Sequence, residues 1–105
     1  PQEVALLDVK RGIKMFEKLG VKILGLVDNM SFFIGDDGKK YKIFGEGGVK
    51  KTADEFKKEF LGEIPIDPKV GKTGDEGMPI VESDPTCEVS KIYFDFANKI
   101  KSTYL

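Results

Sequence analysis

The sequence has few of the residues that most often carry enzyme chemistry, with one cysteine and no histidine among 105 residues. The single thiol, Cys87, excludes a disulfide within the chain and any metal site built from several cysteines of one copy. The lack of histidine removes the commonest metal ligand and the commonest general base. No acid–base pair or nucleophilic triad can therefore be assembled from the residue types alone.

A long apolar run and an excess of one charge are also missing. No apolar segment of about 18 residues and no targeting signal are visible, so we expect no membrane contact and a reducing, cytoplasmic location. The 17 basic and 18 acidic residues nearly cancel, which leaves no electrostatic footprint for nucleic acid. A length of 105 residues fits one small domain.

The most informative stretch of the chain is residues 23–31, in which an apolar run over 23–27 stops abruptly at Asp28 and Asn29. Such a run is typical of a parallel strand buried on both faces, which we predict over 21–28. Ligands of open α/β sheets bind at the carboxyl ends of such strands. The Asn29 amide offers a donor and an acceptor to a planar partner such as a nucleobase, although an asparagine here would also close a turn.

Two long helices are predicted, one at each end of the chain. The first ends at Gly20. The last begins near Asp84-Pro85, where Asp84 would cap the helix and Pro85 would take its first position. The apolar residues that share one face of these helices are Ala5, Val9, Ile13 and Phe16 in the first and Val89, Ile92, Tyr93, Phe96 and Ile100 in the last.

Between these helices we predict a hairpin, a shorter helix and a second parallel strand. The pair Asp37-Gly38 predicts a hairpin within 31–44. A helix over 49–59 and a strand over 60–64 follow, and their order after the first strand implies a right-handed crossover with a parallel strand pair. The Gly- and Pro-rich stretch 65–83 is predicted to hold one helical turn or two.

The predicted elements include too few strands for a complete parallel sheet. Parallel strands need neighbours and helices on both faces, yet only two are predicted and the chain opens inside a helix. We therefore expect the carboxyl-terminal part of a larger α/β unit. The alternative is a complete small α+β domain.

Two glycine-rich stretches resemble phosphate-binding loops, and neither fits. Gly71-Lys72-Thr73 lacks the glycine five positions earlier, where Ile66 stands, and Pro65 and Pro68 remove N–H groups that would contact phosphate. The stretch 45–48 opens a helix, whose N-terminus can bind an anion, but lacks the third spaced glycine of a dinucleotide motif. We expect it to serve as a flexible entry to the helix.

Five segments, taken in order, closely resemble the Mrp/ApbC family, which are MinD-related P-loop ATPases that act as iron–sulfur cluster carriers. The segments are 5–13, 27–33, 43–48, 61–67 and 74–81. The resemblance covers essentially the whole chain, and the ordered combination is specific although no single piece is. It implies that residues 1–105 are the carboxyl-terminal half of an Mrp-like nucleotide-binding domain. The implied fold class is α/β, the carboxyl-terminal part of a doubly wound parallel-sheet P-loop NTPase fold with a small β-hairpin excursion.

The resemblance also implies an ATP site. This chain would contribute one part of the site, and the amino-terminal half of the family's domain, which is absent here, would contribute the other. The family's phosphate loop and switch aspartates, which act on ATP with Mg²⁺, lie in the absent amino-terminal half. Asn29 matches the asparagine that contacts the adenine base, and Pro65, Ile66 and Asp67 match the second segment that lines the base. The parent is thus expected to be a P-loop ATPase, while this chain alone is expected to be inactive.

Implied partners are the amino-terminal phosphate-loop half, a second copy in a homodimer and apoproteins that accept clusters. Asp8 and Arg11 match a helix near the nucleotide and the dimer face, and their spacing would also give an ordinary surface ion pair. Most family members carry a Cys-x-x-Cys after the Asn-Met-Ser segment, which holds a bridging cluster in the dimer. Here 33–38 contains no sulfur, as in some plastid relatives, so an iron–sulfur cluster would lack its thiolate ligands at this site.

Two hypotheses for the function remain, the first of which rests on the resemblance. The first is a fragment of an ATP-binding ATPase that supplies the adenine pocket and the dimer surface without hydrolysing ATP on its own. The second is a non-enzymatic interaction module, or truncated remnant, that self-associates or binds a partner through exposed strand edges and the aromatic hairpin.

Overall fold

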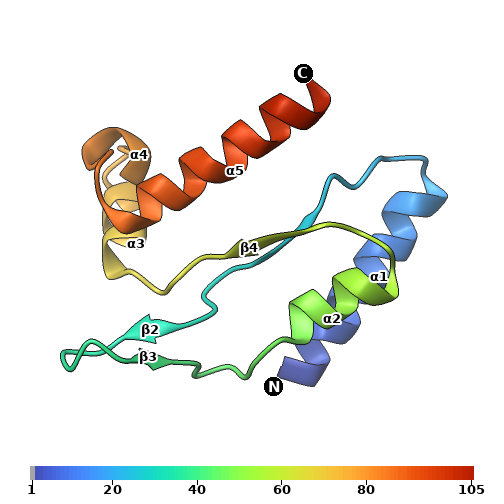
Figure 1. Ribbon diagram of the computed structural model, residues 1–105, viewed down its shortest axis with the longest axis horizontal. Coiled ribbons are helices and arrows are strands. Elements are labelled where there is room, and N and C mark those ends of the chain that lie inside the picture. Colours follow the sequence, from blue (N-terminus) through green and yellow to red (C-terminus); the bar gives the residue numbers. More distant parts are fainter. Residues whose placement is uncertain (1) are drawn as a thin grey trace.

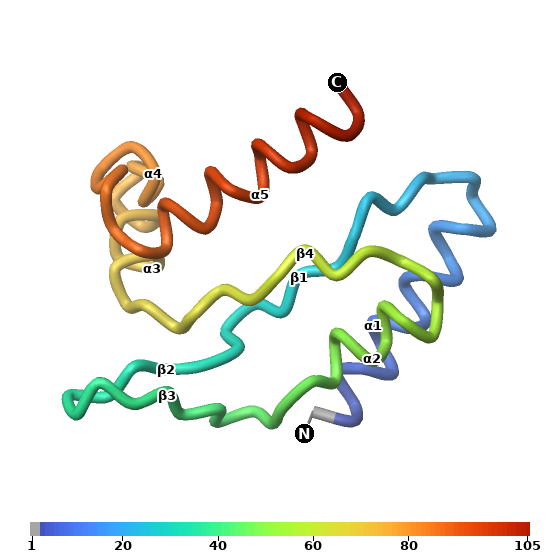
Figure 2. Tube along the Cα trace, in the orientation of Figure 1, coloured from blue at the N-terminus to red at the C-terminus, as the bar shows by residue number. Residues whose placement is uncertain are grey.

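A parallel pair of strands, β1 (Leu26–Asp28) and β4 (Phe60–Glu63), separates the helices of the protein into two groups (Figure 1). The computed structural model describes residues 2–105. Helices α1 and α2 lie on one side of the strand pair and α3, α4 and α5 on the other, and the hairpin β2–β3 extends from one end (Figure 2). The remaining elements are α1 (Gln2–Lys18), β2 (Phe33–Ile34), β3 (Lys40–Tyr41), α2 (Gly48–Glu55), α3 (Pro68–Asp75), α4 (Ile80–Ser83) and α5 (Glu88–Tyr104).

Each face of the strand pair has its own hydrophobic core. On one face Leu26 packs with Ile13 of α1 and Ala53 of α2. On the other face Val27 packs with the cluster formed by Ile64, Ile80 and Val89. Because neighbouring residues of a strand point to opposite faces, this arrangement confirms the prediction of a parallel strand covered on both sides.

The two strands are joined in an irregular register. Leu26 is opposite Phe60, whereas Val27 is opposite Gly62, so Leu61 is an extra residue in β4. Such a bulge bends and twists the strand that contains it. Gly62 has a φ of +144°, a backbone conformation that favours glycine.

Replacement of Gly62 is expected to destabilise the fold. In Gly62→Ala the new Cβ would lie 3.0 Å from Cε1 of Phe96 and would also have to adopt the positive φ. Together these effects should lower the free energy of unfolding by about 1–3 kcal/mol. Gly71→Ala in α3 is the matched control, because its Cβ meets nothing within 4 Å. Chemical denaturation of both variants measures the difference, and equal midpoints would contradict this account of the bulge.

The predicted hairpin and the predicted parallel pairing are both confirmed, while several boundaries are wrong. The strand expected over 21–28 is regular only from Leu26, and the helix expected over 49–59 ends at Glu55. Helix α2 stops early because Lys57 adopts a positive φ of 56°, which turns the chain toward β4. The stretch 65–83 holds more helix than expected, since α3 has eight residues and α4 has four.

The start of the last helix was also wrongly predicted. Asp84 ends α4, because its N–H donates to the Ile80 carbonyl at 2.9 Å, and a turn follows before α5 begins with Cys87 at its N-cap. The hydroxyl of Ser90, which is fully buried, lies 3.1 Å from the Ile80 oxygen and 2.7 Å from the Asp84 oxygen. These contacts fix the end of α4 against the first turn of α5.

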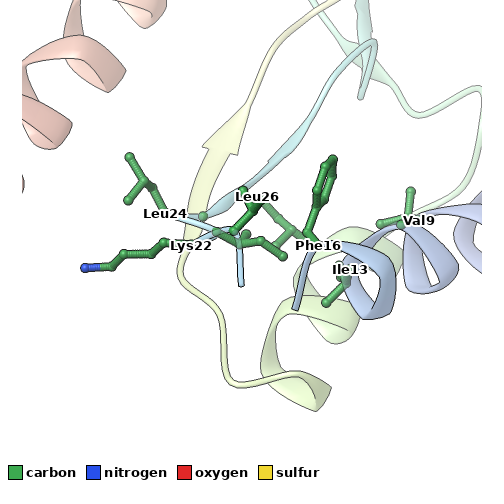
Figure 3. A pocket seen from close by; sticks show the side chains of 10 residues that line it. Val9, Ile13, Phe16, Lys22, Leu24 and Leu26 are labelled. Carbon is green, nitrogen blue, oxygen red and sulfur yellow. The ribbon is translucent and has the colours of Figure 1, made fainter. Parts of the chain in front are cut away.

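The apolar face predicted for the first helix is largely uncovered. Only Ile13 is buried, whereas Val9 and Phe16 are exposed and border a hollow of about 450 Å³ between α1 and residues 21–26 (Figure 3). Other apolar side chains of α1, such as Leu7 and Met15, are exposed as well. None of the helices that the structure describes has the length and apolarity needed to cross a membrane.

Candidate functional site

The carboxyl ends of β1 and β4 lie side by side, and hydrogen bonds continue between the two chains beyond the strands. The Ile64 N–H donates to the Asp28 carbonyl at 2.9 Å, and the Ser31 N–H donates to the Ile64 carbonyl at 2.9 Å. The Ile66 N–H donates in turn to the Phe32 carbonyl at 2.7 Å. The turn after β1 is thereby held directly against the segment that follows β4.

All four residues predicted to contact a nucleobase line one hollow at this edge. Asn29 enters it from the turn after β1, while Pro65, Ile66 and Asp67 enter it from the segment after β4. The hollow has a volume of about 200 Å³ and is completed by Met30, Ile64, Val70, Gly71 and Tyr93. Its position matches the place where open α/β sheets bind ligands.

Asn29 closes a turn and still presents its amide to solvent. Its Oδ1 accepts a hydrogen bond from the Met30 N–H at 2.9 Å, and Met30 itself has a positive φ of 55°. This confirms the turn function that the sequence left open for Asn29. Among the described residues the Asn29 side-chain nitrogen has no hydrogen-bond partner, so it can donate to a ligand in the hollow.

The other predicted residues differ in their burial and in the hydrogen bonds that they already make. Pro65 is buried and Ile66 half-buried, so they form an apolar wall. Asp67 caps α3, because its Oδ1 accepts from the Lys69 N–H at 3.0 Å and Pro68 occupies the first helical position. Capping is the ordinary function of an aspartate before a helix, so Asp67 contributes shape and negative charge at one end of the hollow.

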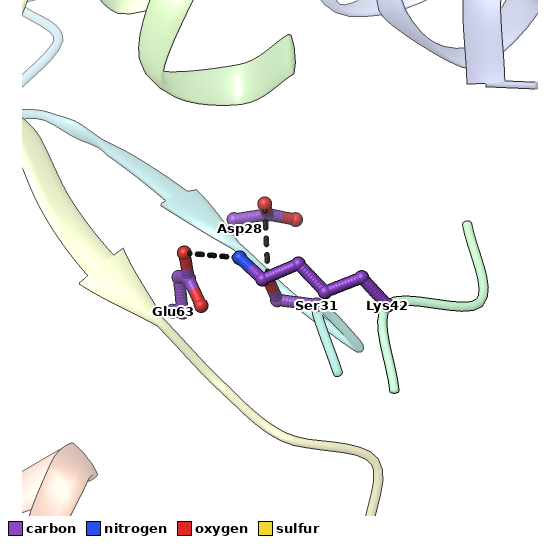
Figure 4. Close-up of polar contacts among 4 residues, drawn as sticks. All are labelled: Asp28, Ser31, Lys42 and Glu63. Atoms are coloured by element: carbon purple, nitrogen blue, oxygen red, sulfur yellow. Dashed lines mark hydrogen bonds and ion pairs between the residues drawn. The ribbon is translucent and has the colours of Figure 1, made fainter. Parts of the chain in front are cut away.

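Two polar contacts near this edge were not found from the sequence (Figure 4). The buried Ser31 hydroxyl donates to Oδ2 of Asp28 at 3.2 Å, which closes the turn that contains Asn29. Nζ of Lys42, which follows the hairpin, donates to Oε1 of Glu63 at 3.1 Å. These two contacts fix the turn and attach the returning arm of the hairpin to the end of β4.

A second, larger hollow lies on the other side of Asn29. Its volume is about 460 Å³, and it runs between α1 and the turn after β1. Its walls are mostly apolar, with Asp28, Asn29 and Ser31 as the polar members, and the apolar lining includes Ala5, Leu6, Val9, Phe44 and Val49. Asn29 therefore stands between two open spaces, a small one toward α5 and a large one toward α1.

The hairpin carries an exposed pair of polar side chains near its tip. The Tyr41 hydroxyl donates to Oδ2 of Asp37, and the Lys39 N–H donates to Oδ1 of Asp37. The hydrogen bond from Tyr41 is the main reason that the pKa of Asp37 lies below its usual value. The same bond raises the pKa of Tyr41 above its usual value of 10.0, because loss of the phenol proton would place two negative charges together.

Removal of the Asp37 charge is expected to lower the pKa of Tyr41 toward its usual value. The change is made with Asp37→Asn, and the titration is followed by the NMR shift of the Tyr41 ring. Asp36→Asn is the matched control, because this neighbouring carboxylate makes no hydrogen bond to Tyr41 in the structure. A Tyr41 titration that is identical in the two variants would contradict the contact.

The two glycine-rich stretches lie within one helix and at the start of another. Gly71-Lys72-Thr73 lies inside helix α3 rather than in a phosphate loop. Gly47 is the N-cap of α2 with a positive φ of 71°, which gives the chain its sharp entry into that helix. Residues 2–105 contain no group of three or more histidine, cysteine, aspartate and glutamate side chains placed to hold a metal ion.

The pair at the start of the chain forms the ion pair that its spacing allowed. Nη1 of Arg11 lies 3.5 Å from Oδ1 of Asp8, and both side chains are well exposed on α1. Ion pairs of this kind contribute little to stability. The pair neither supports nor requires a function in ligand binding.

Comparison with known proteins finds a family model and several relatives that match this chain. A family model described as the ParA family's NUBPL iron-transfer P-loop NTPase matches residues 1–101. The iron-sulfur cluster carrier protein of Aquifex aeolicus is 45% identical over 92% of this chain and 27% of its own length. A mitochondrial protein of Arabidopsis thaliana, named as an iron-sulfur protein required for NADH dehydrogenase, is 45% identical over 95% of this chain and 32% of its own length.

A solved structure supports the same grouping at the level of the fold. The cell division protein MinD of Aquifex aeolicus superposes with a TM-score of 0.64 over 95% of this chain and 40% of its own, at 22% sequence identity. The similarity confirms the predicted α/β fold of the P-loop NTPase type. The chain spans about a third or less of the curated relatives, at 27% and 32% of their lengths.

Proposed function

This chain belongs to the NUBPL family of iron-transfer P-loop NTPases, and on that premise we propose that it supplies the adenine pocket of an ATP site. In this proposal residues 1–105 are the carboxyl-terminal half of an Mrp-like nucleotide-binding domain. The observation that carries the proposal is the hollow of about 200 Å³, where Asn29 meets Pro65, Ile66 and Asp67. These residues come from two segments 35 or more positions apart, so their convergence depends on the fold.

The chemistry of the hollow suits a nucleobase. The Asn29 amide nitrogen is a donor for a ring nitrogen of adenine, and its oxygen retains a lone pair for the exocyclic amine. Pro65 and Ile66 give an apolar surface for the flat face of the base. Interiors of small-ligand sites combine apolar walls with a few directed polar groups in this way.

The phosphates of ATP would be bound outside this chain. Phosphoryl transfer needs a phosphate loop, its lysine and Mg²⁺ to stabilise charge on the transferred group. This sequence has no such loop, because Gly71-Lys72-Thr73 lies in a helix and lacks the required upstream glycine. The function proposed here is therefore recognition of the base, with hydrolysis assigned to the phosphate-loop half of the parent.

The exposed apolar surface of α1 supports a parent that extends beyond this chain. The relatives are three or more times as long as this chain, since the chain spans 27% and 32% of two of them. Val9 and Phe16 border an open hollow of about 450 Å³ beside residues 21–26. We propose that further strands and helices of the parent cover this surface.

Iron–sulfur clusters enter the proposal as cargo of the parent, because relatives are named as iron-sulfur cluster carriers. Such a parent would act as a homodimer in the cytoplasm and would pass clusters to acceptor apoproteins. The stretch 33–38 of this chain, however, contains no cysteine where most members of the family carry a Cys-x-x-Cys. Since clusters are held by thiolates, a cluster in this parent would need ligands from another segment.

A chimera tests the adenine pocket. The amino-terminal part of the Aquifex aeolicus carrier is joined to residue 1 of this chain, and ATP binding is measured by calorimetry. Asn29→Ala is expected to weaken binding about tenfold, because hydrogen bonds to the base contribute about 0.5–1.5 kcal/mol each. Asn98→Ala, an exposed position of α5, is the control and should bind ATP unchanged. Equal affinities for ATP in the two variants would contradict the proposal.

A second candidate function rests on the surface of the hairpin and on the strand edges. Phe33 and Tyr41 are exposed, with ring centroids 6.5 Å apart, and β1 and β4 pair only with each other in the described part of the chain. Open edges can accept a strand from another molecule. In this alternative the chain is a non-enzymatic module that self-associates or binds a partner. Light scattering that shows only monomer over a wide concentration range would argue against self-association.

A further inference from the structure

Tyr93 is the one residue of the hollow that reaches it from α5. Val89, one helical turn earlier on the same face, is buried against Ile64 and Ile80 beneath the hollow. Residues four apart on a helix lie above one another. The Tyr93 side chain therefore continues from this core to the lining of the hollow.

The Tyr93 ring also differs in kind from the rest of the lining. The other lining residues are Asn29, Met30, Ile64, Pro65, Ile66, Asp67, Val70 and Gly71, and none of these has an aromatic ring. Tyr93 remains 37% exposed, although the residues beneath it are buried. A partly exposed ring among mostly apolar lining residues is available to stack on a flat partner.

The size of the hollow limits what such a partner can be. Sites for whole small ligands usually measure about 300–1,000 Å³, and this hollow measures about 200 Å³. It therefore suits one flat part of a ligand whose remainder lies outside. A purine base has this shape, and every base presents a π-face to an aromatic side chain.

We propose that Tyr93 is an additional base-binding residue, which stacks on the adenine while Asn29 binds its edge. This inference rests on the proposed function of the hollow. It assigns a ligand contact to α5, a helix whose apolar stripe otherwise serves only the core. Stacking and edge recognition would together orient the base, with the sugar directed out of the hollow.

Adenosine binding to the 105-residue chain tests this proposal. The affinity is measured by NMR titration, in which stacking should also shift the Tyr93 ring protons through the ring current of the base. Tyr93→Ala is expected to weaken adenosine binding about tenfold, whereas Tyr93→Phe, which keeps the ring, should bind like the wild type. Phe94→Ala is the matched control, because Phe94 is the next residue of α5, is 43% exposed and does not line the hollow.

The outcomes separate this inference from the function on which it rests. If Asn29→Ala weakens adenosine binding and Tyr93→Ala behaves like Phe94→Ala, the stacking contact is wrong and the pocket stands. If adenosine does not bind, or binds equally to wild type, Asn29→Ala and Tyr93→Ala, both proposals are wrong. Should Tyr93→Ala fail to fold, Tyr93→Leu keeps apolar bulk without a flat ring and should show the same loss of affinity.

Discussion

Alone, the 105-residue chain is expected to show no ATP hydrolysis above the uncatalysed rate, whereas its chimera with the Aquifex aeolicus amino-terminal part is expected to turn over ATP. Enzymes accelerate their reactions by about a millionfold or more, and for phosphoryl transfer nearly all of this comes from positioning and charge stabilisation at the phosphates. The described residues supply neither, since their nearest candidate loop, Gly71-Lys72-Thr73, is helical. Release of inorganic phosphate measures the ATP turnover of both proteins.

The control for this experiment is the phosphate-loop lysine of the chimera. Its replacement by alanine should abolish turnover while the adenine pocket is unchanged. The pure chain could instead show turnover that persists through repurification and scales with its concentration. That result would contradict the proposal that hydrolysis belongs to the phosphate-loop half. Such a result would require a phosphate site that neither the sequence nor the structure predicts.

Introduction of a Cys-x-x-Cys at the hairpin tip is expected to create cluster binding that the natural loop lacks. In Asp36→Cys/Lys39→Cys the two thiols flank the Asp37-Gly38 turn, where the Gly35 N–H bonds to the Lys39 carbonyl at 3.0 Å. Because a cluster is held by four thiolates, two chains should together bind about one cluster. Anaerobic reconstitution with iron and sulfide, followed by absorption and iron content, measures the gain from almost none.

Single substitutions provide the controls for the cysteine experiment. Asp36→Cys alone offers one thiol per chain at this site and should bind little iron, and Cys87→Ser in the natural chain should change nothing. Cys87 lies at the N-cap of α5, half-buried, with its sulfur 3.3 Å from the Ser90 hydroxyl. Equal cluster content in the natural chain and the double variant would show that the cysteine pair is not what this loop lacks.

Sequence patterns predicted the elements best where residues close in sequence determine the backbone conformation. The apolar run up to Asp28 predicted a strand with two covered faces, and Asp37-Gly38 predicted the hairpin. Wrong boundaries arose where tertiary contacts override local preference. Asp84 has the residue type of an N-cap, yet its backbone ends α4, and the buried Ser90 hydroxyl binds the same segment.

The candidate site was predictable in part for a similar reason. Asn29, Pro65, Ile66 and Asp67 follow strands, and the carboxyl ends of parallel strands meet at one edge, so their convergence could be expected. Tyr93 could not be placed there, because its helical spacing is that of a core stripe. The spacing of residues on α5 does not reveal which turn of the helix passes the end of β4.

The extent of burial was also beyond the reach of the sequence. Amphipathic spacing in the first helix predicted a shared apolar face, but spacing cannot say which part of that face finds a partner. In the structure Ile13 is buried against Leu26 and Ala53, while Val9 and Phe16 are exposed. Burial depends on neighbouring elements, and those described here cover only the middle of the helix.

Intermolecular NOEs between adenosine and the chain would locate the base directly, without reference to affinity. A base site in the hollow at the ends of β1 and β4 predicts NOEs from the adenine H2 and H8 protons to the side chains of Asn29, Pro65 and Ile66. NOEs confined to the hollow beside α1, at Val9 and Phe16, would contradict it and show that the edge of β1 and β4 is not the base site.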